Sequence, residues 1–252
     1  MCDAMTYDDL LVVLPAEATA LAGAARSVGP DATVPAVPEW TMAKLVKHVG
    51  TTHRWAAANV AATGARVTPR DLDLALPEDV ATLPDWLETG AAELATVLAA
   101  ADPDAPAWTW GDDHRAGFWA RRMVHETAVH RWDAESATGV QVPFRPDLAV
   151  DGIDERLEIL VPSMEFNAAG PAALSGAGES IHLHATDVAG EWLLRFGPDG
   201  FEWSHEHAKG DLAVRGPASD LLLVLVGRRD LQGLEVFGDV GVLDAHAAIT
   251  RF

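Results

Sequence analysis

The spacing of apolar residues changes once along this chain, and that change constrains the fold more than any other feature. Up to about residue 165 the apolar residues recur every three or four positions, the period of an amphipathic helix. From Ser180 the runs IHLHAT, EWLLRF and DLAVRG are short, alternate in character and are separated by turn sequences such as GPDG and AKGD. The sequence therefore predicts an α+β protein, with a helical domain over residues 1–165 and a small α/β domain over residues 180–252.

The helical half contains four long segments with helical spacing, at residues 6–28, 41–62, 84–98 and 117–137. Pro15 is expected to interrupt the first segment, whereas Thr41 is a natural N-cap for the second and Pro84 suits the first turn of the third. Gly139 is well placed to end the fourth segment. Four helices joined by two long connections predict a bundle whose core can be reached from one end.

The second half is predicted to contain a short helix and a further strand. The helix lies in PASDLLLVLVGRRD, opened by Pro217 or Ser219 and closed by Gly227, and the strand is LEVFGD. The residues between the two halves, 165–179, are rich in Gly, Ala, Ser and Pro, a composition typical of flexible connections. We therefore place the domain boundary in that stretch.

The charge balance excludes several classes of partner. The sequence contains 38 acidic and 18 basic residues, a formal net charge of -20, which repels phosphate backbones and anionic lipids. No run of 18 or more apolar residues occurs, and the N-terminus MCDAMTYDDLLVVL carries acids where a signal peptide has basic residues. We expect a cytoplasmic protein, a monomer or weak dimer, that binds neither nucleic acid nor membranes.

Cysteine usage limits how the chain could hold a metal ion. Its only cysteine, Cys2, lies at the N-terminus, so neither a disulfide framework nor a cysteine metal cluster can form. Any metal ion must therefore be held by histidine and carboxylate side chains.

The segment RRMVHETAVHRWD contains both of those ligand types. Its HE pair resembles the start of the zinc-protease motif HExxH, but His125 and His130 are five apart, roughly 140° around a helix, and cannot share one ion. Glu126 and His130 are four apart and therefore neighbours on one helix face, and Asp133 follows one turn later. Glu126 and His130 thus form a pair of potential ligands with a carboxylate beside it.

Two ligands hold a metal ion poorly, so a third should come from another helix. His48 is the candidate because it lies in the middle of the amphipathic segment at 41–62. Three protein ligands would leave one coordination position open, the arrangement of catalytic zinc sites. The spacing leaves two other interpretations open: a solvated ion pair of Glu126 with His130, or a buried His48 hydrogen-bonded to a carboxylate.

Two longer segments, EWTMAKLVKHVGTTHRW and FWARRMVHETAVHRWDAE, resemble the mycothiol-dependent maleylpyruvate isomerase family, which belongs to the DinB-like four-helix metalloproteins. They match the family patterns W-T/S-x-x-x-L-x-x-H and H-E-x-x-x-H-R-x-D. The resemblance implies a divalent metal ion, usually Zn²⁺, held by His48, Glu126 and His130. The run GDLAVRGPASDLLLVLVGRRDLQGLEVFGD is similar to the small sterol-carrier-like α/β domain that many members append.

Asp133 is a candidate for catalysis through its effect on His130. Histidines that bind metal ions usually donate their other ring proton to a carboxylate, and Asp133 could accept it. An ion pair of Asp133 with Arg131 or Arg122 is equally compatible with the spacing.

Arg215 is the second candidate for catalysis, and it depends on the resemblance. In family members with isomerase activity an arginine of the C-terminal domain is thought to help bind the anionic substrate, and Arg215 lies in the similar strand end AVRG. Arg228 and Arg229 are alternative counterparts, and a surface charge without a role is the simplest interpretation of all three.

Other aromatic and histidine residues have simpler expectations. Large aromatic residues at helical spacing usually lie in the core, which applies to Trp40, Trp55, Trp119 and Trp132. His182 and His184 stand two apart on a predicted strand, as His205 and His207 do near another strand end, so each pair faces one side. Surface histidines on a small sheet need no ligand, so the sequence favours that interpretation over a second metal site.

The candidate metal site and the resemblance together predict an enzyme. The open coordination position would bind a low-molecular-weight thiol, mycothiol if the resemblance holds, as its thiolate. The thiolate would add to an electrophilic carbon of a small-molecule substrate; collapse of the adduct after bond rotation gives isomerisation, and persistence gives S-transfer. The alternatives are a hydrolase that uses metal-bound water and a non-catalytic protein that binds a small apolar ligand.

Overall fold

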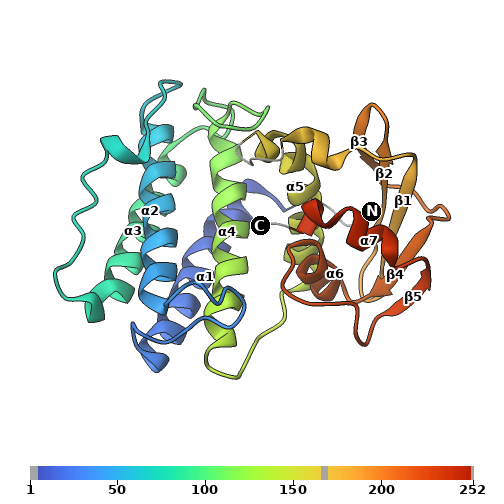
Figure 1. Cartoon of the computed structure of the whole chain (residues 1–252). Coiled ribbons are helices and arrows are strands. Elements are labelled where there is room, and N and C mark those ends of the chain that lie inside the picture. Colours follow the sequence, from blue (N-terminus) through green and yellow to red (C-terminus); the bar gives the residue numbers. More distant parts are fainter. Residues whose placement is uncertain (1–4, 166–169, 251–252) are drawn as a thin grey trace. The chain divides into compact units, whose positions relative to one another are not determined.

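The structure, a computed structural model, describes residues 5–165 and 170–250 and divides the chain into two compact units (Figure 1). One unit comprises Thr6–Val142, and the other begins at Pro143. The boundary predicted at residues 165–179 lies later in the chain than this division, because helix α5 (Pro146–Met164) packs against α6 (Ala218–Leu225) of the second unit. Helical spacing alone does not show which other helix α5 packs against. Residues 166–169 of the predicted connection lie outside the described residues.

The first unit is a bundle of α1 (Tyr7–Val28), α2 (Met42–Ala61), α3 (Leu83–Ala100) and α4 (Ala116–Ser136). These helices agree with the four predicted segments. Thr41 caps α2 as expected, because its hydroxyl accepts a hydrogen bond from the Lys44 amide at 3.3 Å. Pro84 lies in the first turn of α3, and Gly139 adopts a positive φ of 78° just beyond α4.

Helix α1 runs without a break through Pro15, contrary to expectation. Packing against α3 and α4, with Leu14 and Leu21 fully buried, outweighs the loss of one backbone donor. By length and composition alone α1 could also cross a membrane. Core helices of soluble bundles have the same properties, so this feature does not by itself indicate a membrane.

The contact between α2 and α4 positions the residues of interest. Helix α2 packs against both α3 and α4, and its apolar residues Met42, Leu45 and Val49 are fully buried in the core of this unit. His48 therefore lies on a part of α2 that can face α4. The connection before α2 is fixed by turns, in which the Val34 amide donates to the Trp40 carbonyl at 3.1 Å.

The second unit combines helices with a mixed sheet. Its described strands are β1 (Glu179–Ala185), β2 (Glu191–Gly197), β3 (Gly200–Ser204), β4 (Leu212–Gly216) and β5 (Glu235–Gly238), in the order β3-β2-β1-β4-β5. Strands β1 and β4 pair in parallel, and the other neighbours pair antiparallel. Helices α6 and α7 (Gly241–Ala245) pack against the sheet, and α5 packs against α6 (Figure 1). The chain's short 3₁₀ helices in the described ranges are Pro69–Asp71, Val80–Thr82, Pro171–Leu174 and Ala247–Thr250. The predicted α+β class is confirmed.

The two faces of the sheet differ in chemistry. One face turns apolar residues such as Ile181, Leu194 and Val214 towards α6 and α7, and the space that these groups enclose measures about 10 Å³. That space is no larger than one water molecule needs. The opposite face carries His182 and His184, since residues alternate along a strand.

Candidate metal centre

Three side chains from α2 and α4 converge inside the first unit. The Nε2 atom of His48 lies 2.9 Å from Oε1 of Glu126, and the Nε2 atom of His130 lies 3.4 Å from the same oxygen. Their ligand atoms all lie within 4.8 Å of one another. Glu126 and His130 meet because they are one turn apart on α4, and His48 joins them across the contact between helices.

Glu126 is held in its ionised form. Burial alone would raise the pKa of Glu126, but hydrogen bonds from His130 and His48 and the charge of Arg122 hold it well below its usual range. The guanidinium of Arg122, one turn earlier on α4, donates to Oε2 at 2.8 Å. Oε1 is therefore the oxygen that faces the two histidines. From its spacing in the sequence, Arg122 is expected only as a partner of Asp133.

His130 is oriented from its other side. Its Nδ1 donates to Oδ2 of Asp133 at 2.9 Å, and Asp133 is fully buried. Burial alone would lower the pKa of His130, but the hydrogen bonds and charges of Asp133 and Glu126 raise it to about 9. The two carboxylates thus favour a cation at this place, whether a proton or a metal ion.

These residues fit a divalent metal ion. Two histidines and one glutamate are among the donor sets of catalytic zinc sites, and bonds of about 2.0–2.1 Å would separate ligand atoms by roughly 3.3 Å. The observed separations of 2.9 and 3.4 Å are close to that value. The side chain of His48 is 37% exposed, so the group is accessible from one side.

Trp40 lies beside both histidines, although the sequence placed it in the core. Its ring centroid lies 4.9 Å from that of His48, edge on, and 5.9 Å from that of His130, nearly parallel. The ring is half-buried and also packs against the apolar core, and the Lys44 ammonium lies 4.9 Å from its centroid. Trp40 therefore forms one wall of the site, a role that helical spacing could not reveal because Trp40 precedes α2.

The structure does not bring His125 into this group, in line with the five-residue spacing. Another histidine, His53, is fully buried five residues beyond His48 on α2. Its Nε2 lies 2.8 Å from the Thr127 hydroxyl, which donates its own proton to the Met123 carbonyl. His53 must therefore donate from Nε2, and burial lowers its pKa to about 3. No sequence pattern distinguishes His53 in advance from other helical residues.

The three arginines considered for substrate binding all belong to the second unit. Arg215 on β4 donates to Glu235 on β5 at 3.1 Å, and its side chain is 41% exposed. Arg229 pairs with Asp220, and Arg228 donates to the Val226 carbonyl. Each therefore has a local partner.

Two family models account for most of the chain. The model described as "Mycothiol maleylpyruvate isomerase N-terminal domain" matches residues 14–135, and "MDMPI C-terminal domain" matches residues 147–245. The chain belongs to the mycothiol maleylpyruvate isomerase family. The resemblance noted in the sequence is thereby confirmed. The two matched ranges lie on either side of the division at Val142, so the family's domain organisation agrees with the compact units.

Solved structures of the same family share the fold. A crystal structure of the mycothiol-dependent maleylpyruvate isomerase is 14% identical, with a TM-score of 0.65 over 94% of this chain and 95% of that chain. A histidine-to-alanine mutant is 13% identical, with the same TM-score and coverage. At such low identity the two matches show a shared fold and do not show a shared reaction. A comparison with curated proteins found no match.

Proposed function

We propose that this chain is a metal-dependent enzyme that activates a low-molecular-weight thiol, mycothiol, for addition to a small electrophilic substrate. The observation that carries this proposal is the convergence of His48, Glu126 and His130 on one accessible point, in a member of this family. Zn²⁺ or another divalent cation held there would lower the pKa of a bound thiol, so that it loses its proton near neutral pH.

The surrounding residues have distinct tasks in this scheme. Asp133 holds the proton on Nδ1 of His130, which keeps Nε2 directed towards Glu126. Arg122 balances the charge of Glu126 through Oε2 and leaves Oε1 to the site. Trp40 covers both histidine rings on one side and limits water there.

The reaction would be addition of sulfur to an electrophilic carbon. When the substrate is an alkene conjugated to a carbonyl group, the carbon–sulfur bond forms as the electron pair of the double bond moves onto the carbonyl oxygen, giving an enolate. The remaining single bond rotates, and return of the electron pair expels the thiolate and restores the double bond in the other configuration. No oxidant or reductant is needed. If the anionic adduct instead takes up a proton, the carbon–sulfur bond persists and the outcome is S-transfer. The same residues serve both outcomes, and family membership favours isomerisation.

The space behind the apolar face of the sheet does not suit the alternative of an apolar-ligand carrier. A carrier needs an enclosed space of several hundred Å³. The space between the apolar sheet face and α6 measures about 10 Å³. The described part of that interface is filled by side chains.

The test is to titrate mycothiol into cobalt-loaded protein at pH 7. We expect thiolate-to-cobalt charge-transfer absorption that saturates at about one equivalent, because a coordinated thiol is deprotonated. Glu126→Ala and His130→Ala should abolish the band, His125→Ala should retain it, and glutathione should bind less well. Absence of a band with both thiols, while the metal stays bound, would refute thiol activation and favour a metal-dependent hydrolase. Isomerisation of maleylpyruvate with mycothiol then tests the reaction.

A further inference from the structure

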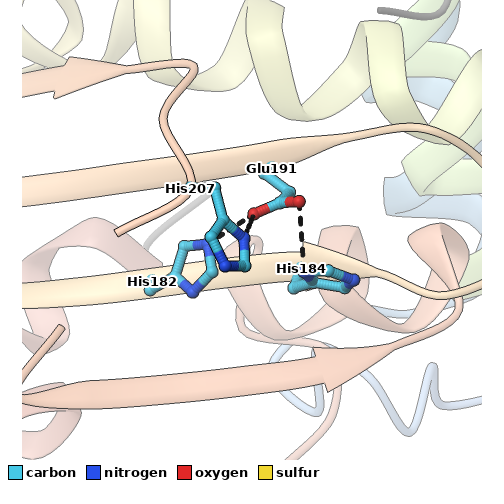
Figure 2. A group of neighbouring side chains, drawn as sticks. All are labelled: His182, His184, Glu191 and His207. Atoms are coloured by element: carbon cyan, nitrogen blue, oxygen red, sulfur yellow. Dashed lines mark hydrogen bonds and ion pairs between the residues drawn. The ribbon is translucent and has the colours of Figure 1, made fainter. Parts of the chain in front are cut away.

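A second group of potential metal ligands lies in the second unit, on the sheet face that does not meet α6 and α7. It consists of His182 and His184 on β1, Glu191 at the start of β2, and His207 after the end of β3 (Figure 2). Alternation along β1 puts its two histidines on one face, and the antiparallel register places Glu191 opposite His184. Three separate chain segments thus contribute to one cluster.

The four side chains point towards a common centre. Glu191 Oε2 lies 3.1 Å from His182 Nε2 and 2.5 Å from His207 Nδ1, and its Oε1 lies 3.4 Å from His184 Nδ1 (Figure 2). The ring centroids of the three histidines are 5.6–6.1 Å apart, with interplanar angles of 74–90°. Rings that meet edge to face around one carboxylate direct their nitrogen atoms inwards, as rings bound to a common ion do.

The dimensions of the cluster suit a small ion. The four ligand atoms lie within 4.8 Å of one another, and a tetrahedral zinc site needs separations of roughly 3.3 Å. The side chain of His207 is 78% exposed and can rotate to close the difference, whereas that of His182 is only 8% exposed and is fixed in place. Because His182 is fixed and His207 can rotate, the ligand atoms can come closer together around an ion.

The segment that carries His207 is anchored independently. His205 lies 3.2 Å from the Glu191 carbonyl through Nδ1 and 3.3 Å from Asp154 of α5 through Nε2, and its ring packs against Trp203. His207 is thereby held above the sheet. Arg215, the register partner of His184 on β4, is turned to Glu235, so its charge already has a partner.

We propose that His182, His184, Glu191 and His207 bind a second divalent transition-metal ion, for which Zn²⁺ is the best match. Imidazole-rich sites with one carboxylate suit zinc and its first-row neighbours. Four protein ligands fill a tetrahedral site, in contrast to the three ligands of the first group. The ion would cross-link β1, β2 and the segment after β3, and its role is structural. The overall charge of -20 also favours cations near this surface.

The experiment uses the full chain, freed of metal and titrated with Zn²⁺. The variant His48→Ala with His130→Ala removes the first group, and we expect it still to bind about one equivalent and to melt at a higher temperature with Zn²⁺. Adding Glu191→Gln and His207→Ala should abolish both effects, since His207 is too exposed for its loss to disturb the core. His114→Ala, which alters a histidine of neither group, is the control.

Two results would overturn the second site. One is a His48→Ala/His130→Ala variant that folds but neither binds Zn²⁺ nor changes its melting temperature. The other is binding that survives Glu191→Gln and His207→Ala. If the double variant does not fold, Glu191→Gln with His207→Ala in the otherwise unchanged chain must lower the bound zinc from about two equivalents to about one. None of these measurements depends on thiol activation, so they stand apart from the proposed enzyme function.

Discussion

Nδ1 of His130 lies 2.9 Å from Oδ2 of Asp133, one turn further along α4. Asp133 is fully buried, so its carboxylate cannot exchange this partner freely for water. A carboxylate accepts but does not donate, so the proton of a neutral His130 ring must reside on Nδ1. The Nε2 lone pair is then left for a metal ion, and the ring cannot rotate away without losing the contact.

Asp133→Asn should therefore weaken metal binding at the first group by about 10–100-fold. An asparagine can turn its amide N–H₂ towards Nδ1 and impose the opposite tautomer, which places a proton on the ligand nitrogen. The measurement is a zinc competition titration against a chelator, in a Glu191→Gln/His207→Ala background so that one group is observed. Asp104→Asn, at a side chain that is 72% exposed, is the matched control. Equal zinc affinities with and without Asp133→Asn would show that Asp133 does not contribute to the site.

Each first-group ligand should be needed for its metal ion. His48→Ala, Glu126→Ala and His130→Ala should each lower the bound metal by about one equivalent, because two remaining ligands hold an ion poorly. His125→Ala should not, since His125 lies elsewhere on α4. Metal analysis after dialysis decides between them. Loss of metal from His125→Ala together with retention in Glu126→Ala would show that the ligands are wrongly assigned.

Helical geometry explains why part of this site could be predicted. The four-residue spacing places Glu126 beside His130 on any straight helix, and Asp133 follows at a three-residue spacing. His48 required the resemblance to a family as well, because a single helix cannot show what lies across from it. The place of Trp40 beside the two histidines could not be predicted, since it depends on the turns before α2, which no periodicity describes.

The histidines of the sheet show a similar limit. Alternation on β1 predicted that His182 and His184 face one side, and the structure agrees. Their convergence with Glu191 and His207 depends on the register between β1 and β2 and on the path after β3. Such register is set by packing of the whole sheet, so local sequence patterns favoured isolated surface histidines instead.

His53 should make the stability of the chain fall in mild acid. Its pKa is lowered to about 3 in the folded chain, mainly by burial, whereas an unfolded chain has about 6.5. Below pH 6.5 the unfolded state therefore binds a proton that the folded state refuses until about pH 3. The free energy of unfolding is therefore not reduced by His53 above pH 6.5. Between pH 6.5 and pH 3 this group lowers it by up to about 1.4 kcal/mol for each pH unit.

The variant His53→Gln tests this pH dependence. Glutamine can still donate to the Thr127 hydroxyl but does not titrate, so the slope of unfolding free energy between pH 6 and pH 4 should be smaller by about one proton. Urea unfolding at a series of pH values gives both slopes. His114→Gln, at an exposed histidine, should leave the slope unchanged. Parallel curves for His53→Gln and the unaltered chain would contradict the assignment.

The pairing of Arg215 with Glu235 gives a two-sided test of the proposed substrate arginine. Their side chains meet at 3.1 Å and are 41% and 60% exposed, so the pair contributes little to stability. If Arg215 binds the anionic group of the substrate, the substrate must compete with Glu235 for the guanidinium. Removing Arg215 and removing its competitor should then have opposite effects on substrate binding.

We therefore expect Arg215→Ala to raise KM for maleylpyruvate by roughly tenfold, the loss of one partly exposed charge-assisted contact, with little change in kcat. Glu235→Gln should lower KM, because the substrate no longer competes with the Glu235 carboxylate for the guanidinium of Arg215. Arg195→Ala, at an exposed arginine that pairs with Glu206, serves as the control for the loss of one positive charge from the same unit. Steady-state kinetics at fixed mycothiol, with melting temperatures for each variant, separate these effects from changes in stability. A KM that moves in the same direction in Arg215→Ala and Glu235→Gln, or in neither, would show that the pair belongs to the surface of the sheet and not to substrate binding.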